Sequence, residues 1–215
     1  GDYVLDRIRR LVETGQDSCE TVYRLRKGEQ GYIWVKNISA LMPDEDGNAR
    51  IYAVFSDVTE DMNERAELRN RYNDMLIEHH KGFVHGEIIT GHCNITRNFI
   101  IEITDQTNSR LLETFGTARE PFFTGLAGLV VDENERRAFL EAFLAPPLQA
   151  AFERGDLKHE LECFVKLPTE EQGRYVRIVV KLVVSPDSGD LIGVLSVLDV
   201  TEQKISEQIL NRLSH

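Results

Sequence analysis

The sequence is poor in cysteine and in basic charge, and each shortage argues against a class of protein. Its three cysteines, Cys19, Cys93 and Cys163, lie far apart and form no Cys-x-x-Cys pair, so neither a zinc site nor a disulfide framework is indicated. Its 25 basic residues stand against 36 acidic ones, giving a net charge of −11, which disfavours a phosphate-binding surface. We therefore expect a cytoplasmic setting and no nucleic-acid partner.

Long apolar runs are also missing. No run approaches the roughly 20 residues that a membrane-spanning helix needs, and the first residues lack the pattern of a signal peptide. We expect no membrane contact by this segment. Hydrophobic residues nevertheless make up 41% of the 215 residues, enough to bury a core in one large or two small domains.

One four-residue motif occurs twice. Asp-Val-Thr-Glu occurs at 57–60 and again at 199–202. The segments before it, 32–60 and 175–202, are alike: each has a Tyr, a β-rich run, a turn with Pro and Gly, and a second β-rich run. The repeat predicts two copies of one unit, each ending in three antiparallel strands followed by a helix.

A helix is expected between the copies. Residues 60–80 contain neither Pro nor Gly and are rich in helix-forming residues. Apolar residues from Leu68 to Leu76 recur at a spacing near 3.5, but Arg65 and Arg69 occupy two positions of the same seam. A weak coiled coil and a lone helix packed on a neighbouring domain both remain open.

The second copy has a front half that the first lacks. Residues 87–96 and 98–104 predict a strand pair joined by a tight turn, and a short helix should end at Gly116. A longer helix should begin near Asp132 and be interrupted around Pro146-Pro147. Strand, strand, helices and three strands make a complete α+β module, whereas the first 56 residues contain only its last helix and last three strands.

These features resemble a known family. The element order, the stretch "RYVRIVVKLVVSPDSGDLIGVLSVLDVTEQ" and the matching "GYIWVKNISALMPDEDGNARIYAVFSDVTED" are similar to the C-terminal halves of PAS domains of bacterial sensory proteins. The resemblance implies a five-stranded antiparallel sheet in the order 2-1-5-4-3 with helices on one face. It divides the chain into the end of a first PAS module (1–60), a linker helix (61–84), a complete PAS module (85–202) and the start of an output-linking helix (203–215).

The missing front half has a consequence for the first module. In the implied sheet order, the run "RIYAVFSDV" (50–58) would be an open apolar edge strand, which is a template for aggregation. We expect the chain to be a piece of a longer protein. Disordered earlier residues, or another chain that supplies the pairing, are the alternatives.

Cofactors of the family are not expected here. Its light-sensing members place a reactive Cys in an Asn-Cys-Arg-Phe-Leu-Gln stretch, which this sequence lacks, so we expect no flavin. Its haem-binding members place a His on the long helix, and 132–154 contains none. Alternation predicts that Cys93 and Cys163 are small buried hydrophobes, and that His92 and His159 face solvent.

A cavity between sheet and helices is the candidate ligand site. Several aromatic and aliphatic side chains could line it, and a tyrosine could orient a small molecule; plain core packing is the alternative. The residues are Phe122, Phe123, Leu126, Phe139, Phe143 and Tyr175. The sequence shows no catalytic motif and no metal-spaced cluster.

The repeated Asp-Val-Thr-Glu motif is the second candidate site. Asp57 and Asp199 are predicted to be helix N-caps, with Glu60 and Glu202 closing a capping box three residues later. Such a junction joins the last strand of each sheet to an outgoing helix. We expect these positions to relay a signal, together with the threonines of the motif, Thr59 and Thr201.

The resemblance implies a non-catalytic sensory or regulatory fragment of a bacterial signalling protein. A small-molecule or protein signal would pass through the linker helices to an output domain in the same polypeptide, either a cyclic-dinucleotide enzyme or a histidine kinase. A homodimer through linker helices and sheet faces is expected. One alternative is a dimerisation or spacer module without a ligand; another is a small cone-shaped α+β enzyme, for which no buried carboxylate pair is apparent.

Overall fold

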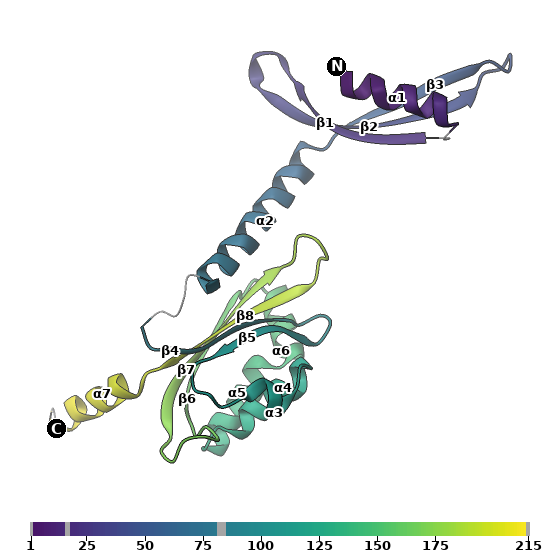
Figure 1. Ribbon diagram of the computed structural model, residues 1–215. Helices are drawn as coiled ribbons and strands as arrows, with labels where there is room; N and C mark the ends of the chain where they lie inside the picture. The colour runs from purple at the N-terminus through teal and green to yellow at the C-terminus, as the bar shows by residue number, and fades with distance from the viewer. Residues whose placement is uncertain (1, 16–17, 81–84, 214–215) are drawn as a thin grey trace. The chain divides into compact units, whose positions relative to one another are not determined.

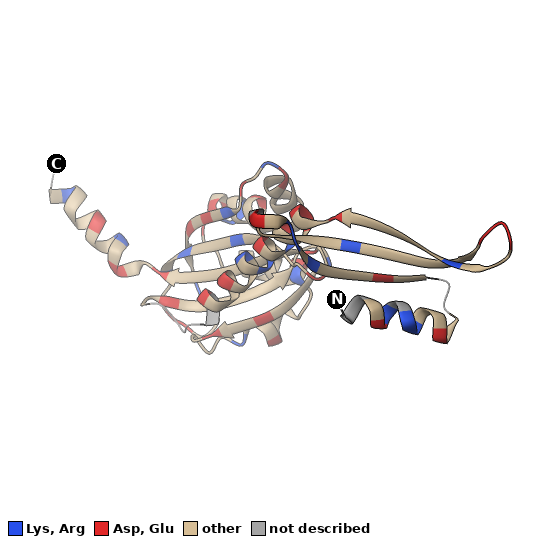
Figure 2. Ribbon diagram, turned by 90° about the horizontal axis from the view of Figure 1, so that it is seen from above, with Lys and Arg blue, Asp and Glu red and all other residues tan. Residues whose placement is uncertain are grey.

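The computed structural model describes residues 2–15, 18–80 and 85–213. The chain forms two compact units, Gly1–Glu67 and Leu68–His215, and each is described by itself. Among the described helices, none is both long and apolar enough to cross a membrane. Figure 2 shows acidic residues in both units.

The first unit is a three-stranded antiparallel sheet with one helix beside it (Figure 1). Helix α1 (Asp2–Thr14) precedes β1 (Ser18–Arg26), β2 (Tyr32–Pro43) and β3 (Ala49–Asp57), and the strands lie in the order β1-β2-β3. Helix α1 packs on β1 and β2 through Leu11, which is 1% exposed. The predicted content of this segment, one helix and three strands, is confirmed.

The turn between β2 and β3 is held by one carboxylate. Asp44 accepts hydrogen bonds from the backbone N–H groups of Asp46 (3.0 Å) and Asn48 (2.8 Å) and from Nε of Arg50 (2.7 Å). The bond from Asn48 is the largest cause that lowers the pKa of Asp44. Gly47 has φ +81°, a conformation that glycine adopts without strain.

Helix α2 (Thr59–His80) follows the first sheet. It begins two residues before the predicted linker, 61–84, and residues 81–84 lie outside the described part of the chain. Whether α2 forms a coiled coil with a second copy stays a prediction.

The second unit contains a five-stranded antiparallel sheet with helices on one face (Figure 1). The strands lie in the order β5-β4-β8-β7-β6. Numbered by their appearance within this unit, that order is 2-1-5-4-3. Their bounds are β4 (Glu87–Asn94), β5 (Phe99–Asp105), β6 (Lys158–Val165), β7 (Arg174–Val184) and β8 (Leu191–Asp199).

Helices connect β5 to β6 and leave the sheet after β8. The connecting helices are α3 (Leu111–Phe115), α4 (Arg119–Gly128), α5 (Glu133–Phe143) and α6 (Ala145–Glu153). They pack their apolar sides on the sheet, where residues such as Phe122, Phe139 and Phe143 are at most 1% exposed. The exit helix is α7 (Thr201–Leu213).

The predicted long helix, 132–154, is two helices. Asp132 is its N-cap, as expected, and accepts from the N–H groups of Asn134 (2.9 Å) and Glu135 (3.0 Å). The break falls at Leu144, which is extended (φ −69°, ψ 160°). The two prolines therefore lie in the first turn of α6, where their missing N–H groups would have had no helical partner.

Two predictions about polarity differ in outcome. Cys93 and Cys163 are 2% and 1% exposed, which confirms that they are buried. The prediction that His92 faces solvent is wrong, since it is 7% exposed. Its neighbours on the adjacent strands are Glu102 of β5, whose carboxylate lies 3.8 Å from Nδ1 of His92, and Val194 of β8.

Candidate functional site

The first junction ties β3 and α2 to the neighbouring strand β2. The carboxylate of Asp57 accepts hydrogen bonds from the N–H (3.0 Å) and the hydroxyl (2.6 Å) of Thr59. The Thr59 hydroxyl in turn accepts from the backbone N–H of Trp34 at 2.9 Å, and Val58 N–H donates to the Trp34 carbonyl at 2.9 Å. The bonds from Thr59 lower the pKa of Asp57, so the group stays ionised at neutral pH.

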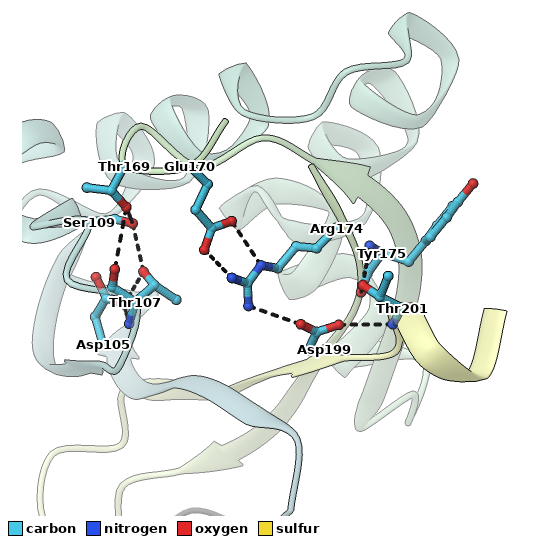
Figure 3. Close-up of polar contacts among 9 residues, drawn as sticks. All are labelled: Asp105, Thr107, Ser109, Thr169, Glu170, Arg174, Tyr175, Asp199 and Thr201. Carbon is cyan, nitrogen blue, oxygen red and sulfur yellow. Dashed lines mark hydrogen bonds and ion pairs between the residues drawn. The ribbon is translucent and has the colours of Figure 1, made fainter. Parts of the chain in front are cut away.

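The second junction is similar, although the Thr201 hydroxyl donates to the Tyr175 carbonyl, at 3.5 Å, where that of Thr59 donates to Asp57. Asp199 accepts from the N–H of Thr201 at 2.9 Å, and the Thr201 hydroxyl accepts from the backbone N–H of Tyr175 at 3.0 Å (Figure 3). Val200 N–H donates to the Tyr175 carbonyl at 2.9 Å. In both units the first turn of the exit helix is therefore bonded to the same position of the adjacent strand.

The predicted capping box is wrong. Helices α2 and α7 begin at the threonines, two residues after Asp57 and Asp199, so the aspartates precede the N-cap. Among the described residues, no hydrogen bond joins Glu60 to Asp57, and the N–H of Asp199 donates to the Gly86 carbonyl at 2.7 Å instead. The threonine, which can donate and accept at once, takes the role expected of the glutamate.

An arginine strengthens the second junction. Arg174 donates from Nη1 to Asp199 at 3.0 Å and from Nε to Glu170 at 3.0 Å, with a further bond from Nη2 to Glu170 (Figure 3). The corresponding position of the first unit is Ile33, so the first junction lacks this bridge. Sequence reasoning missed Arg174, which is the first residue of β7.

An ion-pair cluster holds the exit helix further along. Lys204 of α7 pairs with Glu162 of β6, and Arg177 of β7 donates to the same carboxylate from Nη2 at 2.7 Å. The pKa of Glu162 is lowered, first by the bond from Lys204 and then by that from Arg177. At neutral pH this cluster fixes the first two turns of α7 to the sheet.

A second polar cluster lies on the loop after β5. Asp105 accepts from the N–H (2.7 Å) and hydroxyl (2.6 Å) of Thr107, whose hydroxyl lies 2.7 Å from that of Ser109. Ser109 reaches Thr169 at 3.2 Å (Figure 3). The cluster joins this loop to the connection between β6 and β7.

A small cavity lies in the second unit between the sheet and helices α4 and α5. Its volume is about 40 Å³, which holds a few water-sized molecules at most, whereas ligand pockets are usually several hundred Å³. All of its lining residues are apolar: Ile88, Ile89, Phe123, Leu126, Leu129, Val130, Phe139, Val165, Leu167, Val176, Ile178, Leu195 and Val197.

Three of the predicted pocket residues line this cavity and three do not. Phe123, Leu126 and Phe139 are part of its wall. Phe122 and Phe143 are fully buried and pack edge-on against neighbouring aromatic rings. Tyr175 contacts Phe164 at 4.9 Å between ring centroids and belongs to the junction.

A fully buried arginine lies beside the cavity. Arg119 is 0% exposed; it donates from Nη2 to the Phe143 carbonyl at 2.7 Å and from Nε to the Cys93 sulfur at 3.2 Å. It also pairs with Glu120, whose carboxylate accepts from the N–H of Ala145 at 3.1 Å. The pair thus connects α4 to the end of α5 and the start of α6.

Cys93 and Cys163 lie in environments that disfavour the thiolate. Burial raises the pKa of Cys93, and the neighbouring Arg119 only partly opposes this. Burial raises the pKa of Cys163 to about 12, with a smaller contribution from Glu135. Both shifts disfavour the thiolate, which is the reactive form of cysteine.

The first unit buries polar side chains where the second buries apolar ones. Thr21, Asn37 and Ser39, called the polar row below, are at most 4% exposed and share one face of the sheet. The Ser39 hydroxyl donates to Asn37 at 3.3 Å, and the Thr21 hydroxyl has no hydrogen-bond partner among the described residues.

The equivalence of positions follows from strand register. Val35 opposes Asp57 in the first unit, and Val176 opposes Asp199 in the second. Counting outward from these pairs gives the apolar counterparts of the polar row in the second unit, which are Leu161, Ile178 and Val180.

Comparison with known proteins gives distant likenesses. No protein-family model and no curated protein sequence match the chain. Among solved structures, the N-terminal domain of a diguanylate cyclase with PAS/PAC sensor from Marinobacter aquaeolei is 15% identical, with a TM-score of 0.36 over 54% of this chain and 97% of that one. An RNA-binding light-oxygen-voltage receptor is 12% identical, with a TM-score of 0.37 over 96% of this chain and 84% of that one. Both TM-scores are below 0.5, so neither structure decides the function of this chain.

Proposed function

We propose that this chain is a non-catalytic sensory or relay element built from a partial and a complete PAS-like module. The observation that carries the proposal is the junction built twice: in each unit a threonine of the exit helix accepts the N–H of the same strand position. A junction that fixes a helix to a sheet at two points converts a change in the sheet into a movement of the helix. Helices α2 and α7 are then the signal outputs of the two modules.

The downstream partner in this proposal is an output domain of the same polypeptide. Helix α7 has exposed apolar side chains, among them Ile205, Ile209 and Leu213, which suit contact with a further helix. A cyclic-dinucleotide enzyme or a histidine kinase fits such a helical input. A cytoplasmic location and dimerisation are part of the same proposal.

The polar row offers polar side chains for a small-molecule signal, which the cavity lacks. The cavity of the second unit offers no polar side chain to orient a ligand. The polar row offers two hydroxyls and an amide on one buried face, and no charged residue. An uncharged molecule with hydroxyl or amide groups fits that chemistry.

A spacer without a ligand is the second candidate. The tightness of the cavity, about 40 Å³, favours this function for the second unit. In that case its sheet and helices transmit strain between α2 and α7 without binding anything. Native mass spectrometry of the purified chain separates the two candidates, because a bound metabolite adds its mass and a spacer does not.

The relay is tested by breaking one junction. We expect Asp199→Ala, which removes the acceptor of the Thr201 N–H and of Arg174, to lower the amide order parameters of the first turn of α7 while the sheet stays ordered. Glu202→Ala, three residues later, is the matched control, because Glu202 makes no hydrogen bond to the junction within the part of the chain that the structure describes. Equal loss of order in the two variants, or loss of the sheet together with the helix, would contradict the proposal.

A further inference from the structure

The C-terminal half of α2 belongs to the second unit, Leu68–His215, and two ion pairs attach it to the sheet of that unit. Oε2 of Glu78 lies 3.2 Å from Nζ of Lys181 on β7. Nη2 of Arg69 lies 3.8 Å from Oδ1 of Asp187, in the turn between β7 and β8. The two ion-paired residues of α2 are about 14 Å apart along the helix, so this half of α2 lies along the β7–β8 hairpin.

The helix lies on the face of the sheet opposite α3 to α6. Side chains alternate between the two faces of a strand. Val180 and Leu182, on either side of Lys181, are each 1% exposed and belong to the core beneath those helices, so Lys181 points to the other face. Val194 of β8 is directly opposite Lys181 in the sheet and shares this second face, called the outer face below.

Buried apolar residues lie on the outer face between the two ion pairs. Val183 and Ile192 oppose each other, two residues closer to the hairpin turn than Lys181 and Val194. Val183, Ile192 and Val194 are 5%, 2% and 8% exposed, although none of them belongs to the core beneath α3 to α6. Their burial requires a cover on the outer face, and the ion pairs place α2 there.

The apolar stripe of α2 faces the sheet. With about 100° between successive residues of a helix, the stripe lies between Glu78 and Arg69, the two residues that reach the sheet. Its side chains are half-buried, whereas Ile77, on the opposite side of the helix, is 51% exposed. The residues of the stripe are Leu68, Tyr72, Met75 and Leu76.

The same stripe is the seam of the coiled coil that the spacing in α2 predicts. Leu68, Tyr72 and Met75 are separated by the four-residue and three-residue steps of such a seam. A side chain that packs on the sheet cannot also pack between two helices. Docking of α2 on the sheet and its pairing with a second helix therefore compete for the same residues.

We propose that α2 is a switch between two partners: it is docked on the outer face of its own second unit, or released and paired with α2 of a second copy. The two states exclude each other. The inference rests on the proposed function only in its dimerisation, for which it supplies a condition. The bond between Thr201 and Tyr175 takes no part in it, so the relay at α7 can hold or fail independently.

A charge on the outer face tests the competition. Val183→Glu leaves every residue of α2 intact. Spin labels at Asp74 of α2 and Glu141 of α5 should give a narrow distance distribution in the otherwise wild-type chain and a broad one in Val183→Glu. Sedimentation of the unlabelled 215-residue chain should show association that is about tenfold stronger or more in Val183→Glu, because apparent affinity follows the fraction of released helix.

Two further variants control this measurement. Val131→Glu, at a residue of the second unit that is 56% exposed, should change neither the distance distribution nor the association. Tyr72→Glu, added to Val183→Glu, should abolish the gain in association, because it places a charge in the helix seam.

A charge swap tests the same competition without altering the apolar residues of the sheet. Glu78→Lys sets two like charges against each other at Lys181 and should strengthen association about threefold, the scale of an exposed ion pair. Adding Lys181→Glu restores the pair with its charges exchanged, and should return association to the wild-type value although α2 still carries its substitution.

Four results would overturn the proposal. They are a broad distance distribution in the wild-type chain, release of α2 in Val183→Glu without stronger association, a gain in association that survives Tyr72→Glu, and a charge swap that fails to reverse the effect of Glu78→Lys. The third result would place the contact between copies outside the stripe of α2.

Discussion

The hydroxyl of Thr201, at the start of the exit helix, accepts a hydrogen bond from the backbone N–H of Tyr175 on β7 at 3.0 Å. A threonine is suited to this place because its hydroxyl supplies the acceptor while its methyl group restricts its rotamer. The same bond joins Thr59 to Trp34 in the first unit at 2.9 Å. The first residue of each exit helix is thus bonded to the neighbouring strand.

Replacing this hydroxyl should loosen the junction. Thr201→Val keeps the shape of the side chain but leaves the N–H of Tyr175 without its acceptor, at a cost of about 1–2 kcal/mol. The Tyr175 amide should exchange with solvent about tenfold faster or more. Thr201→Ser, which keeps the hydroxyl, is the control. An unchanged exchange rate in Thr201→Val would show that the bond does not hold the strand.

Acid should detach the exit helix from the sheet. The pKa of Glu162 is lowered by Lys204 and Arg177, so the folded state binds the proton less tightly than the unfolded state. The stabilisation is therefore present at neutral pH and is lost as pH falls below about 4 and through the lowered folded-state pKa. Nuclear magnetic resonance of α7 across this range should show it becoming mobile.

A charge-neutral variant checks the cause of that transition. Glu162→Gln should loosen α7 already at pH 7 and remove this step from its acid titration. Glu207→Gln is the control, because Glu207 lies 3.8 Å from Lys204 and is half-exposed. Retention of the same acid transition in Glu162→Gln would assign it to another group.

Thr21→Val should stabilise the first unit. The variant removes a buried hydroxyl with no hydrogen-bond partner among the described residues, and valine has nearly the same shape. A gain of about 1 kcal/mol in the free energy of unfolding is expected. The single tryptophan, Trp34, lies in this unit, so its fluorescence during urea unfolding reports the change.

Ser39→Ala provides the comparison for that measurement. It removes a hydroxyl that donates to Asn37 at 3.3 Å, and should leave stability unchanged or lower it. A loss of stability in Thr21→Val as well would mean that the Thr21 hydroxyl is bonded in solution.

Arg119→Met should destabilise the second unit strongly. The guanidinium is 0% exposed and bonds a carbonyl, a sulfur and a carboxylate, so its removal leaves Glu120 with a charge that lacks its buried partner. Such losses cost about 3–5 kcal/mol. Calorimetry should show the second unit melting earlier, whereas Arg137→Met, at an exposed position of α5, should have little effect. Equal melting of the two variants would contradict the role given to Arg119.

The sequence was informative where local pattern decides structure. The repeated Asp-Val-Thr-Glu motif correctly located both strand-to-helix junctions, because Asp and Thr side chains form local hydrogen bonds at the starts of helices. The motif wrongly suggested that Glu60 and Glu202 complete the junctions with Asp57 and Asp199. Their spacing fits a capping box, but the helices begin at Thr59 and Thr201, which does not allow one. The order of strands followed from family resemblance and not from alternation alone.

Tertiary contacts explain what sequence reasoning missed. Arg119 was not singled out, since a charged residue is rarely fully buried, and only folding brings it to Phe143 and Cys93. His92 was expected to face solvent because the neighbours of its strand were unknown. The polar row left a visible signal: Asn37 and Ser39 alternate on one strand, where the repeat has Ile178 and Val180.

The most direct test of the relay is a double-mutant cycle on the position of α7. Spin labels at Gln208 of α7 and Glu141 of α5 report the distance between helix and module, and Val176→Ala disturbs the sheet beside the junction. With Thr201 intact, Val176→Ala should shift the mean distance by about 1–2 Å, the usual scale of a helix movement. With Thr201→Val the distance distribution should already be broad, and Val176→Ala should change it no further. The same shift in both backgrounds would contradict the account, because the sheet would then move α7 without the junction.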